Sequence, residues 1–358
     1  MISRFLSRRW SLLMFIVACI IVFGNLLVQL PYTFHDKLVS VGSAVQAKAV
    51  DKTHIILLWH WPYGNAFSLE GGYCKEHFDI SNCIMVADRS RFPEADLVVF
   101  HNWELARTHT EQLPVNLTRP EKQRWVWVTR ESPLFNGDVK PLNGYFNLTM
   151  TYRRDSDIYT PYGIMLPKKT VSEEPLENFI PKNKDKLVCW VVSNFKPKYL
   201  RTAVYQKLKK VIPVEVYGKG GNRTIDQEAL TPTISRCYFY LSFENSVHKD
   251  YITEKLWYNG YRSGAVPVVL GPSREEYEAV ADKDSFIHVN DFNTVEELGV
   301  FLKNLTVDKE RYASYFSYRR KYNAVRKFWT ESLCKFCPTI STLPPYKVYE
   351  DLDAWQNA

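Results

Sequence analysis

Blocks of like charge, internal repeats and low-complexity tracts are all absent from this chain of 358 residues. Its 46 basic and 39 acidic residues are interspersed, and the net charge is only +7. There is also no recognisable nucleic-acid-binding motif, so nucleic acid is not an expected partner. The hydrophobic content of 46% and the charged content of 24% exclude a disordered chain and are typical of a globular protein. The modest basic excess favours local cations that face a small anionic ligand.

One long apolar run lies near the N-terminus, from residue 11 to residue 30, and it is long enough for a helix to cross a bilayer. The positive-inside rule places residues 1–10 in the cytosol and the rest of the chain in the lumen, because three arginines precede the run: Arg4, Arg8 and Arg9. A cleaved signal peptide is the alternative, but the run exceeds the usual apolar core of such peptides and no small-residue cleavage site closely follows it. We therefore expect a type II signal anchor, followed by a stem over residues 31–50.

Cysteine is sparse, with seven residues of which Cys19 lies in the expected anchor. The other six are an even number in an oxidising compartment, which predicts three disulfides with 15 possible pairings. They are Cys74, Cys83, Cys189, Cys237, Cys334 and Cys337. The CxxC formed by the last two is alternatively a redox pair or half of a zinc site. Since a second CxxC is lacking and the motif lies near the chain end, structural disulfides are the preferred interpretation.

Four Asn-x-Thr sequons agree with residence in the secretory pathway. They are Asn116, Asn147, Asn222 and Asn304. Such tripeptides also occur by chance, so they support the lumenal placement without deciding it.

From His54 onward, apolar strands alternate with helical patterns, which predicts α/β layering. Strands are expected at 55–59, 97–101, 125–129, 148–152, 187–192, 214–217, 237–243, 266–270 and 286–289. Helices are expected at 199–210, 253–262, 274–280 and 294–304, and a Pro- and Lys-rich linker at 167–186. The pattern predicts two α/β domains, 51–180 and 181–330, the second with a doubly wound parallel sheet. Residues 331–358 are expected to pack back on the body, with disulfides to the first domain as one means of attachment.

The segment 238–258, YFYLSFENSVHKDYITEKLWY, combines an aromatic strand, a polar turn and the start of a helix. Ligands of open α/β sheets bind at the carboxyl ends of strands, where helix N-termini face anions. Asn, Tyr, Glu and Lys gathered there are suited to a nucleotide, with glutamate on the ribose hydroxyls and lysine on phosphate. A solvated loop with a polar helix cap is the alternative interpretation.

The string FENSVHKDYITEKL resembles the donor-binding signature of the α1,3/α1,4-fucosyltransferases, glycosyltransferase family 10. The resemblance covers residues 54–351 and includes FNLTMTYRRDSDIYTPYG (146–163), LVCWVVSN (187–194), VPVVLGPSREEYE (266–278) and SFIHV (285–289). It implies a GT-B fold, in which two Rossmann-like domains face a cleft, and a vertebrate-type enzyme of the Golgi membrane. Periodicity alone predicts only two α/β domains.

The resemblance implies transfer of L-fucose from GDP-β-L-fucose to the N-acetylglucosamine of N-acetyllactosamine-type glycans on glycoproteins and glycolipids, giving Lewis x or sialyl Lewis x structures. A β-linked donor that yields an α-fucoside is inverted in one displacement. This step needs a base for the acceptor hydroxyl and cations around the departing diphosphate. The alternatives are an α1,4-active (Lewis a) enzyme, a catalytically silent glycan-binding member, and a GT-B transferase that uses another nucleotide sugar.

Glu131 is the candidate general base. It follows the expected strand WVWVT at its carboxyl end, and family members carry W.W..ESP here with the base at this glutamate. A loop carboxylate ahead of Pro133 is the alternative. Thr129 and Arg130 depart from the family pattern, in which Asn-Leu-type residues are frequent. Arg130 would depress the pKa of Glu131 if it faced inward.

The resemblance assigns the donor phosphates to Arg201 and Lys255, because a guanidinium binds phosphate oxygens in pairs and an ammonium adds a point charge. Glu254 is expected on the ribose. A lone helical cation is usually a solvated residue, and here only the family position argues otherwise. The other donor-pocket candidates are Ser193, Asn194, Tyr217, Gly218, Asn245 and Tyr251.

Asp155-Ser156-Asp157 has the DxD pattern that holds a divalent metal in GT-A transferases. It lies in the first expected domain, whereas Arg201 and Lys255 serve the phosphates in the second, so we interpret it as structural. No metal site and no cofactor are therefore expected, and a non-specific stimulation by Mn²⁺ or Mg²⁺ is left open.

His101 and Trp103 are the acceptor-side candidates, in a segment (100–104) that the family associates with acceptor choice. Asn102 replaces a usual histidine there, so the preference between type 1 and type 2 chains is left open. Trp103 is suited to stacking on a sugar, and a core tryptophan is the equal alternative. Residues 60–64, HWPYG, are expected to border the donor sugar or the acceptor.

Overall fold

The computed structural model describes residues 53–69, 72–108, 112–221 and 223–358. The expected cytoplasmic tail, anchor and stem lie outside these residues. Within the part of the chain that is described, no helix is long and apolar enough to cross a membrane.

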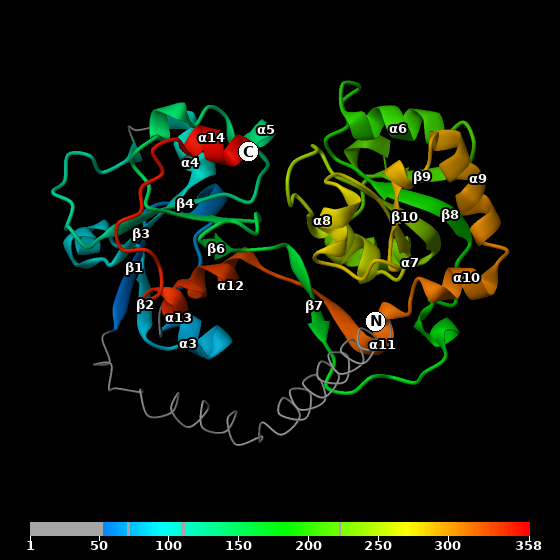
Figure 1. Cartoon of the computed structure of the whole chain (residues 1–358), viewed down its shortest axis with the longest axis horizontal. Coiled ribbons are helices and arrows are strands. Elements are labelled where there is room, and N and C mark those ends of the chain that lie inside the picture. The colour runs from blue at the N-terminus through cyan, green and yellow to red at the C-terminus, as the bar shows by residue number, and fades with distance from the viewer. Residues whose placement is uncertain (1–52, 70–71, 109–111, 222) are drawn as a thin grey trace, which may run out of the picture. The chain divides into compact units, whose positions relative to one another are not determined.

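The first sheet has six parallel strands in the order β2-β1-β3-β4-β5-β6 (Figure 1). Their bounds are β1 His54–Leu58, β2 Cys83–Val86, β3 Leu97–His101, β4 Arg124–Val128, β5 Leu148–Thr151 and β6 Ile158–Tyr159. All five residues of β3 and all four of β5 are buried. Strands buried on both faces often read as continuous apolar runs, as β3 does with LVVFH, whereas β5 buries two threonines, Thr149 and Thr151.

The second sheet has five parallel strands in the order β12-β11-β10-β8-β9. Their bounds are β8 Lys186–Val191, β9 Val214–Tyr217, β10 Cys237–Phe243, β11 Val266–Leu270 and β12 Ile287–His288. Val188 and Trp190 of β8 face a core with helices α6 (Leu200–Leu208) and α9 (Val295–Leu305). Cys189 faces the opposite core, with α7 (Gln227–Ser235). Helices thus cover both faces, and the prediction of parallel α/β sheets is confirmed.

Each expected strand and helix is present within two residues of its expected ends. The sequence did not reveal several short helices: α3 Tyr73–Phe78, α4 Asn102–Thr108, α5 Pro133–Asn136, α10 Lys309–Ser314 and α11 Tyr318–Lys321. It also did not reveal α7, which contains Pro232. The expected helix after β10 is a π-helix over Lys255–Tyr261, a form that recurs at functional sites. The helix expected at 274–280 is α8, Arg274–Glu278.

An antiparallel pair of strands, β7 (Gly163–Pro167) and β13 (Tyr322–Arg326), forms a separate two-stranded sheet. Gly163 packs so tightly on the π-helix that a Cβ atom there would lie 2.3 Å from Cγ of Trp257. The expected linker 167–186 begins at the end of β7 and holds one short 3-10 helix, Leu176–Phe179.

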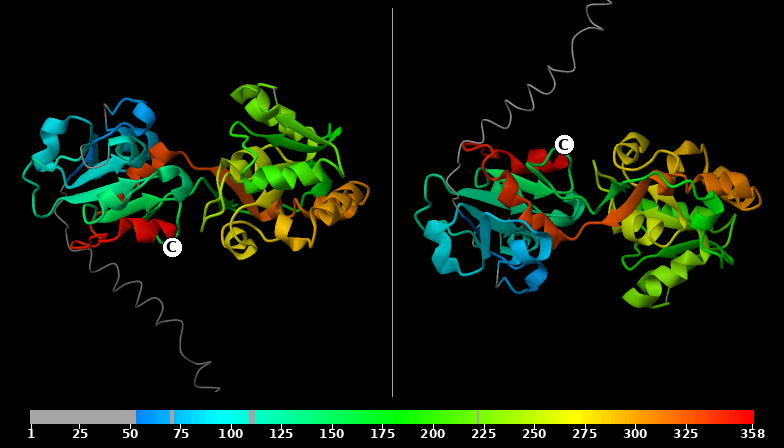
Figure 2. Two further views of the ribbon diagram at one scale, coloured as in Figure 1. Left: turned by 90° about the horizontal axis from the view of Figure 1, so that it is seen from above. Right: turned by 90° about the horizontal axis from the view of Figure 1, so that it is seen from below.

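The C-terminal segment lies against the first sheet, beside strands that precede it by more than 200 residues (Figures 1 and 2). Its helices are α12 Trp329–Cys334, α13 Phe336–Thr339 and α14 Leu352–Asn357. Leu333 and Phe336 share a core with Ile56 and Leu58 of β1, whereas Leu352 packs on the opposite face of the same sheet.

Three disulfides join Cys74 to Cys334, Cys83 to Cys337 and Cys189 to Cys237. The prediction of disulfides is confirmed, and the pairing, which the sequence left open, is now defined. The first two bonds lie side by side, with the sulfurs of Cys74, Cys83 and Cys337 within 4.8 Å of one another. They attach the CxxC segment to the first sheet.

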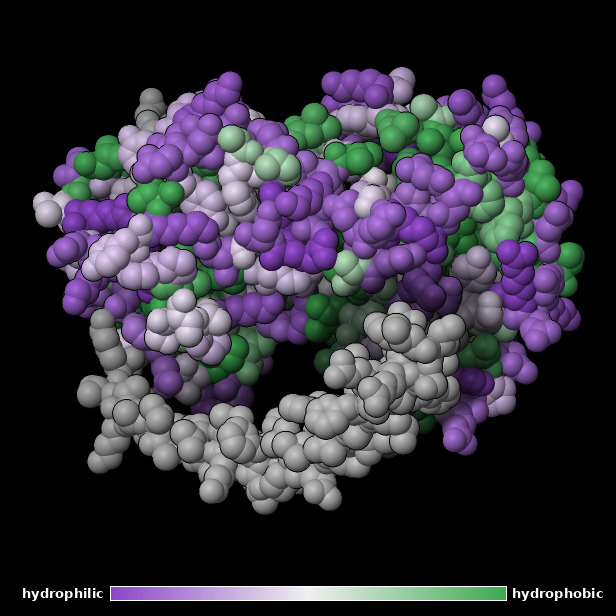
Figure 3. All heavy atoms as spheres, in the orientation of Figure 1, coloured by the Kyte–Doolittle hydropathy of each residue, from purple (hydrophilic) through white to green (hydrophobic). Residues whose placement is uncertain are grey.

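The surface is mixed in character, with hydrophilic residues over most of the face in Figure 3 and apolar residues in scattered spots between them. Asn116 and Asn304 are exposed and Asn222 lies outside the described residues. Asn147, by contrast, is only 9% exposed. Its amide donates to the carbonyl of Lys347 and accepts from the backbone of Trp125. The fold therefore packs this asparagine more closely than the other described sequons, and a glycan at Asn147 stays a prediction.

Candidate active site

Glu131 lies three residues beyond the carboxyl end of β4, half-buried beside the fully buried Ser132. Its backbone N–H donates to Oγ1 of Thr129 at 3.2 Å, which fixes the turn after the strand. Asn136 also donates to the Glu131 carbonyl, at 3.3 Å. The sheet therefore presents this carboxylate at the edge where ligands of parallel α/β sheets bind.

Tyr251 donates its phenol proton to Oε2 of Glu131 over 3.1 Å. The tyrosine is 1% exposed and packs edge-on against Tyr152, with ring centroids 4.9 Å apart. It belongs to the DYITEK string, so the predicted donor-side tyrosine touches the predicted base. The two residues are 120 positions apart in the chain.

Further contacts join the loop after β10 to the turns that follow strands of the first sheet. They are Ser246 Oγ to Ser132 Oγ at 2.6 Å, Arg154 Nε to Asp250 Oδ1 at 2.6 Å, Lys249 Nζ to Asp155 Oδ2 at 2.9 Å, and Tyr152 Oη to His248 Nδ1 at 3.0 Å. Asp250 adopts a positive φ of 59°, a backbone state that aspartate tolerates better than most residues. The Glu131–Tyr251 contact is thus one of several across this junction.

Lys255 lies between two carboxylates, with its Nζ 3.0 Å from Oε2 of Glu244 and 3.1 Å from Oε1 of Glu254. Burial disfavours the charged ammonium, but the two carboxylates outweigh it and raise the pKa of Lys255. The lysine therefore stays cationic throughout the physiological range.

Glu244 is buried and accepts hydrogen bonds from the backbone N–H and the hydroxyl of Thr253. Burial raises its pKa, although Lys255 acts in the opposite direction. Glu254 is more open: its side chain is 40% exposed. Burial opposes its ionisation, but Lys255 prevails and the pKa of Glu254 is lowered. The sequence pattern suggested no separate role for Glu244, although this residue belongs to the same FENS string.

Arg201 is buried at the start of α6, where its guanidinium donates to the carbonyl of Asn194 at 2.5 Å and to that of Phe243 at 3.5 Å. These carbonyls follow β8 and end β10, so the guanidinium bridges two strand ends. Its Nε is buried without a protein partner in the described structure. Burial lowers the pKa of Arg201, with Glu244 acting against that shift. The guanidinium thus keeps one unpaired donor, buried beside the donor-side strand ends.

The remaining donor candidates lie along the same edge of the second sheet. Ser193 and Asn194 are exposed after β8, while Asn245 is half-buried after β10 and accepts from Ser246. Tyr217 ends β9, and Gly218 follows it with a φ of +83°. A Cβ atom on Gly218 would lie 2.7 Å from the Val192 carbonyl, so only glycine permits this approach of the two strand ends.

A cavity of about 220 Å³ lies beside the base and is lined by Glu131 and Glu254 together with Tyr63, His101, Arg130 and Trp329, among others. Arg130 stacks on Tyr162, 3.9 Å above the ring, and donates to the Pro161 carbonyl. It thus contributes to the cavity wall. Burial, and then the charge of Glu131, raise the pKa of Tyr63 to about 12.

Comparisons with known proteins identify the family. The profile described as "Fucosyltransferase, N-terminal" matches residues 51–163, and the one described as "Glycosyltransferase family 10 (fucosyltransferase) C-term" matches residues 181–355. The 4-galactosyl-N-acetylglucosaminide 3-alpha-L-fucosyltransferase 9 of Bos taurus is 43% identical over 301 residues, covering 84% of this chain and 81% of the relative. The chain belongs to glycosyltransferase family 10.

Two other similarities agree with this assignment. The 4-galactosyl-N-acetylglucosaminide 3-alpha-L-fucosyltransferase FUT5 of Hylobates lar is 42% identical over 306 residues, covering 85% of this chain and 80% of the relative. A crystal structure of an alpha1,3-fucosyltransferase with GDP superimposes with a TM-score of 0.50 at 17% identity, covering 85% of this chain and 94% of the other. At that identity the superposition supports a shared fold and nothing further.

In this fucosyltransferase, His101 at the end of β3 and Trp103 in α4 both lie beside Tyr63. The Tyr63 ring lies 4.8 Å from that of His101 and 5.7 Å from that of Trp103. Nδ1 of His101 contacts Oε2 of Glu104 at 2.7 Å, and Trp103 is 42% exposed. An exposed indole at this edge is not a core residue.

Asn102, at the position where family members often carry histidine, is buried and structural. It accepts a hydrogen bond from Trp127 Nε1 at 2.9 Å and donates to the Asn136 carbonyl at 3.0 Å. His60 is buried next to the same strands. Neither side chain lines the cavity beside Glu131.

The DxD carboxylates are bound by separate protein groups. Asp155 accepts two hydrogen bonds from Arg153, at 2.8 and 2.7 Å, and its pKa is strongly lowered by them. Asp157 accepts from Lys347 at 2.7 Å and from Tyr349 at 2.8 Å. Their partners hold the C-terminal segment and the loop after β10, which fits a structural role.

Proposed function

We propose that the chain is an inverting α1,3-fucosyltransferase that moves L-fucose from GDP-β-L-fucose to the N-acetylglucosamine of N-acetyllactosamine-type glycans, with Lewis x and sialyl Lewis x as products. The two sheets are the two halves of a GT-B fold, anchored by residues 11–30 in the Golgi membrane with the catalytic part in the lumen. The names of the relatives, which specify a 3-alpha-L-fucosyl linkage and a 4-galactosyl-N-acetylglucosaminide, support the linkage and the acceptor.

The observation that carries the proposal is the hydrogen bond from Tyr251 to Glu131. It brings a carboxylate from the first sheet against the donor signature of the second, which is where an acceptor hydroxyl must meet the anomeric carbon. Inversion requires a base on the face opposite the departing diphosphate. Glu131, at the edge of the 220 Å³ cavity, is the carboxylate we assign to that task.

In the reaction, the acceptor O3 attacks C1 of fucose as the bond from C1 to the β-phosphate oxygen breaks. The Glu131 carboxylate accepts the hydroxyl proton, and GDP leaves with the electron pair of the broken bond. Positive charge develops on the sugar ring and negative charge on the diphosphate, as in oxocarbenium-type glycosyl transfer.

Arg201 and Lys255 balance the charge of the diphosphate. The buried guanidinium of Arg201 is already oriented by two carbonyls, so little reorganisation is needed when phosphate binds. Glu244 holds Lys255 in place, and Glu254, half-exposed at the cavity, is assigned to the ribose. Because protein cations serve the phosphates, we propose that the enzyme has no dedicated metal site and needs no cofactor. A divalent ion then acts at most as a non-specific stimulant of transfer.

Two substitutions test the assignment when transfer and GDP affinity are measured together on the full chain in detergent. Glu131→Gln is expected to reduce kcat by about 100-fold or more, with GDP affinity nearly unchanged because the residue contacts no phosphate. Lys255→Ala is expected to weaken GDP binding instead. Near wild-type turnover of Glu131→Gln would show that another group is the base.

The donor and the acceptor are tested by competition. GDP-fucose is compared with GDP-mannose and UDP-sugars, on N-acetyllactosamine and on its type 1 isomer, with and without chelator. Transfer to type 2 acceptors that survives chelation is expected. Preferred transfer to the type 1 isomer would indicate the α1,4 activity, and GDP binding without any transfer would indicate a silent glycan-binding member.

A further inference from the structure

The sequon at Asn304 stands beside an apolar groove far from the candidate active site. Asn304 is exposed in the last turn of α9, which ends at Leu305. The groove has a volume of about 530 Å³ and is lined by Asn304 itself, by Val300 and Phe301 one turn earlier, and by Asp308 and Arg311 of α10 and its cap. Leu305 and, at the start of α9, Thr294, Glu296 and Glu297 complete the lining. Residues three and four positions apart lie on one helix face, so the asparagine and the apolar side chains face the same space.

The floor of this groove leaves apolar side chains in contact with water. Val300 is 53% exposed. Phe301 is half-buried against Phe292, with ring centroids 5.1 Å apart. Exposed apolar side chains that gather in one groove, as here, are the kind of surface that marks an interaction site.

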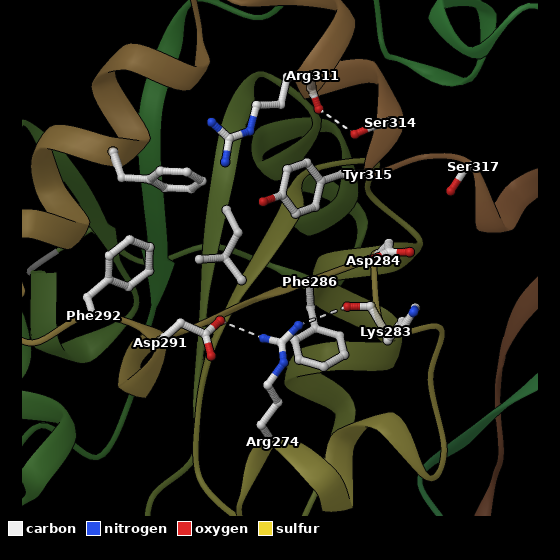
Figure 4. A pocket seen from close by; sticks show the side chains of 12 residues that line it. Arg274, Lys283, Asp284, Phe286, Asp291, Phe292, Arg311, Ser314, Tyr315 and Ser317 are labelled. Carbon is white, nitrogen blue, oxygen red and sulfur yellow. Dashed lines mark hydrogen bonds and ion pairs between the residues drawn. The ribbon is translucent and has the colours of Figure 1, made fainter.

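A free cation borders the same groove. The Arg311 guanidinium lies 5.0 Å above the Phe301 ring, and within the described residues it has no hydrogen bond or ion pair. Its five N–H groups are therefore available as donors. Arg311 and Phe301 also line an adjoining cavity of about 500 Å³, together with Phe286 and Tyr315. Figure 4 shows the side chains of Arg311, Tyr315 and Phe286 around this cavity. Arg274 in this cavity is already paired with Asp291, at 2.5 Å.

We propose that Asn304 carries an N-linked glycan whose first N-acetylglucosamine packs into this groove and stabilises the second sheet. The C–H face of a pyranose is apolar and covers Val300 and Phe301, while its hydroxyl and acetamide oxygens accept hydrogen bonds from Arg311. The adjoining cavity of Figure 4 receives the next sugar of the chain. This modification rests on the lumenal placement proposed above but not on the fucosyltransferase reaction.

The covalent step is that of secretory glycosylation. Nδ2 of Asn304 forms a bond to C1 of N-acetylglucosamine and loses a proton, and the lipid diphosphate of the oligosaccharide donor leaves. Asn116 lies in an exposed loop and lines none of the cavities described here, and Asn147 is buried. Among the described sequons, Asn304 alone combines an accessible acceptor with a groove beside it.

Accessibility of the glycan is the first test. The full chain is expressed in animal cells, and peptide mass spectrometry measures occupancy at Asn304 and Asn116. An amidase that removes N-glycans and leaves aspartate is then applied to the folded protein. A docked glycan predicts release from Asn304 at least about 10-fold slower than from Asn116, and similar rates after denaturation. An unoccupied Asn304, or equal native rates, would overturn the proposal.

Thermal stability is the second test, and it uses a double-mutant cycle. Thr306→Ala removes the sequon and is expected to lower Tm by about 2 °C. Val300→Ser is expected to lower Tm in the glycosylated chain and to have a smaller effect in the Thr306→Ala background, because an exposed valine without a sugar contributes little. Equal effects of Val300→Ser in both backgrounds would mean that a protein partner or a second copy, rather than the glycan, covers the groove.

The matched control is the pair Thr118→Ala and Val115→Ser at the other exposed sequon. Val115 is 59% exposed next to Asn116, and no coupling between these two changes is expected. Fucosyl transfer is measured on the same preparations. A failed transfer assay with slow release at Asn304 would count against the proposed function and leave the glycan site standing.

Discussion

Tyr251 connects the candidate base with the donor-binding segment through a single phenol. Its ring is held on one side by Tyr152, and its hydroxyl reaches Glu131. Because the tyrosine is buried, the hydrogen bond is shielded from water and orients the carboxylate. We therefore propose Tyr251 as a positioning residue for the candidate base, besides its place among the donor-pocket candidates.

Tyr251→Phe is expected to lower kcat by about 10-fold, because the ring stays in place while Glu131 loses a donor. Steady-state kinetics of fucosyl transfer provide the measurement.

Tyr152→Phe is the matched control, because it deletes a hydroxyl that contacts His248 instead of Glu131. Its kcat should stay close to that of the wild type. If both variants lower kcat alike, the effect belongs to the packing of the aromatic pair and not to the hydrogen bond.

His60 predicts an acid-sensitive stability. Burial lowers its pKa from 6.5 to about 4, partly opposed by Glu104, with Arg89 and His101 adding small effects. The unfolded chain therefore binds the proton more readily between these two values, and the free energy of unfolding falls as the pH drops through that window. The loss from this group is at most about 3 kcal/mol.

His60→Asn should flatten the dependence of Tm on pH between 6.5 and 4. The exposed His77 provides a control, and His77→Gln should leave the slope unchanged. An unchanged slope in His60→Asn would assign the acid sensitivity to the carboxylates. Thermal scans in matched buffers give the comparison.

At the scale of elements, the strand ends assemble the site. β4 ends before Glu131, and β8, β9 and β10 end before the donor-side candidates. In parallel strands all carboxyl ends lie at one edge, so residues far apart in sequence converge there. The π-helix that follows begins at Lys255, with Glu244 beneath the lysine.

Gly163→Ala is expected to destabilise the pair β7–β13 by about 1–3 kcal/mol. The added methyl would lie against Cβ and Cγ of Trp257, which is 2% exposed and has no room to move. Leu166→Ala on the same strand, where the leucine is 47% exposed, serves as the control and should cost much less. Equal losses of stability for the two would show that the Trp257 contact is not the cause.

At the scale of the whole described structure, two parallel disulfides tie the C-terminal helices to the first sheet. Cys74–Cys334 and Cys83–Cys337 close loops of 260 and 254 residues. With one bond intact, the other closes only a ring of about a dozen residues. The two bonds are therefore partly redundant.

Removing one bond by paired alanine substitutions should cost about 3 kcal/mol by loop-closure entropy, and removing both should cost well over twice as much. Urea unfolding with a fluorescence probe measures the difference. Strictly additive losses would mean that strain or packing, rather than loop closure, dominates. The Cys189–Cys237 bond, with a separation of 48, provides a comparison within the second sheet.

Several features of the site were predictable because they are local. Buried parallel strands appear in the sequence as largely apolar runs, so the expected bounds of β3, β10 and β11 agree with the observed ones. The donor-binding string was recognisable for the same reason, since its residues lie within one turn and one helix. The burial of Asn147 was not predictable, because its sequon is local, whereas its hydrogen bond to Lys347 joins residues 200 positions apart.

The sequence by itself determined the parallel α/β architecture, the family and the segments that carry the candidate base and the donor contacts. The tertiary structure alone decided the cysteine pairing, the burial of Asn147, the role of Glu244 beneath Lys255, and the contact of Tyr251 with Glu131. The physical reason is separation along the chain. Periodicity reports which faces of a segment are buried, but a contact across 120 residues depends on the packing of all the elements between.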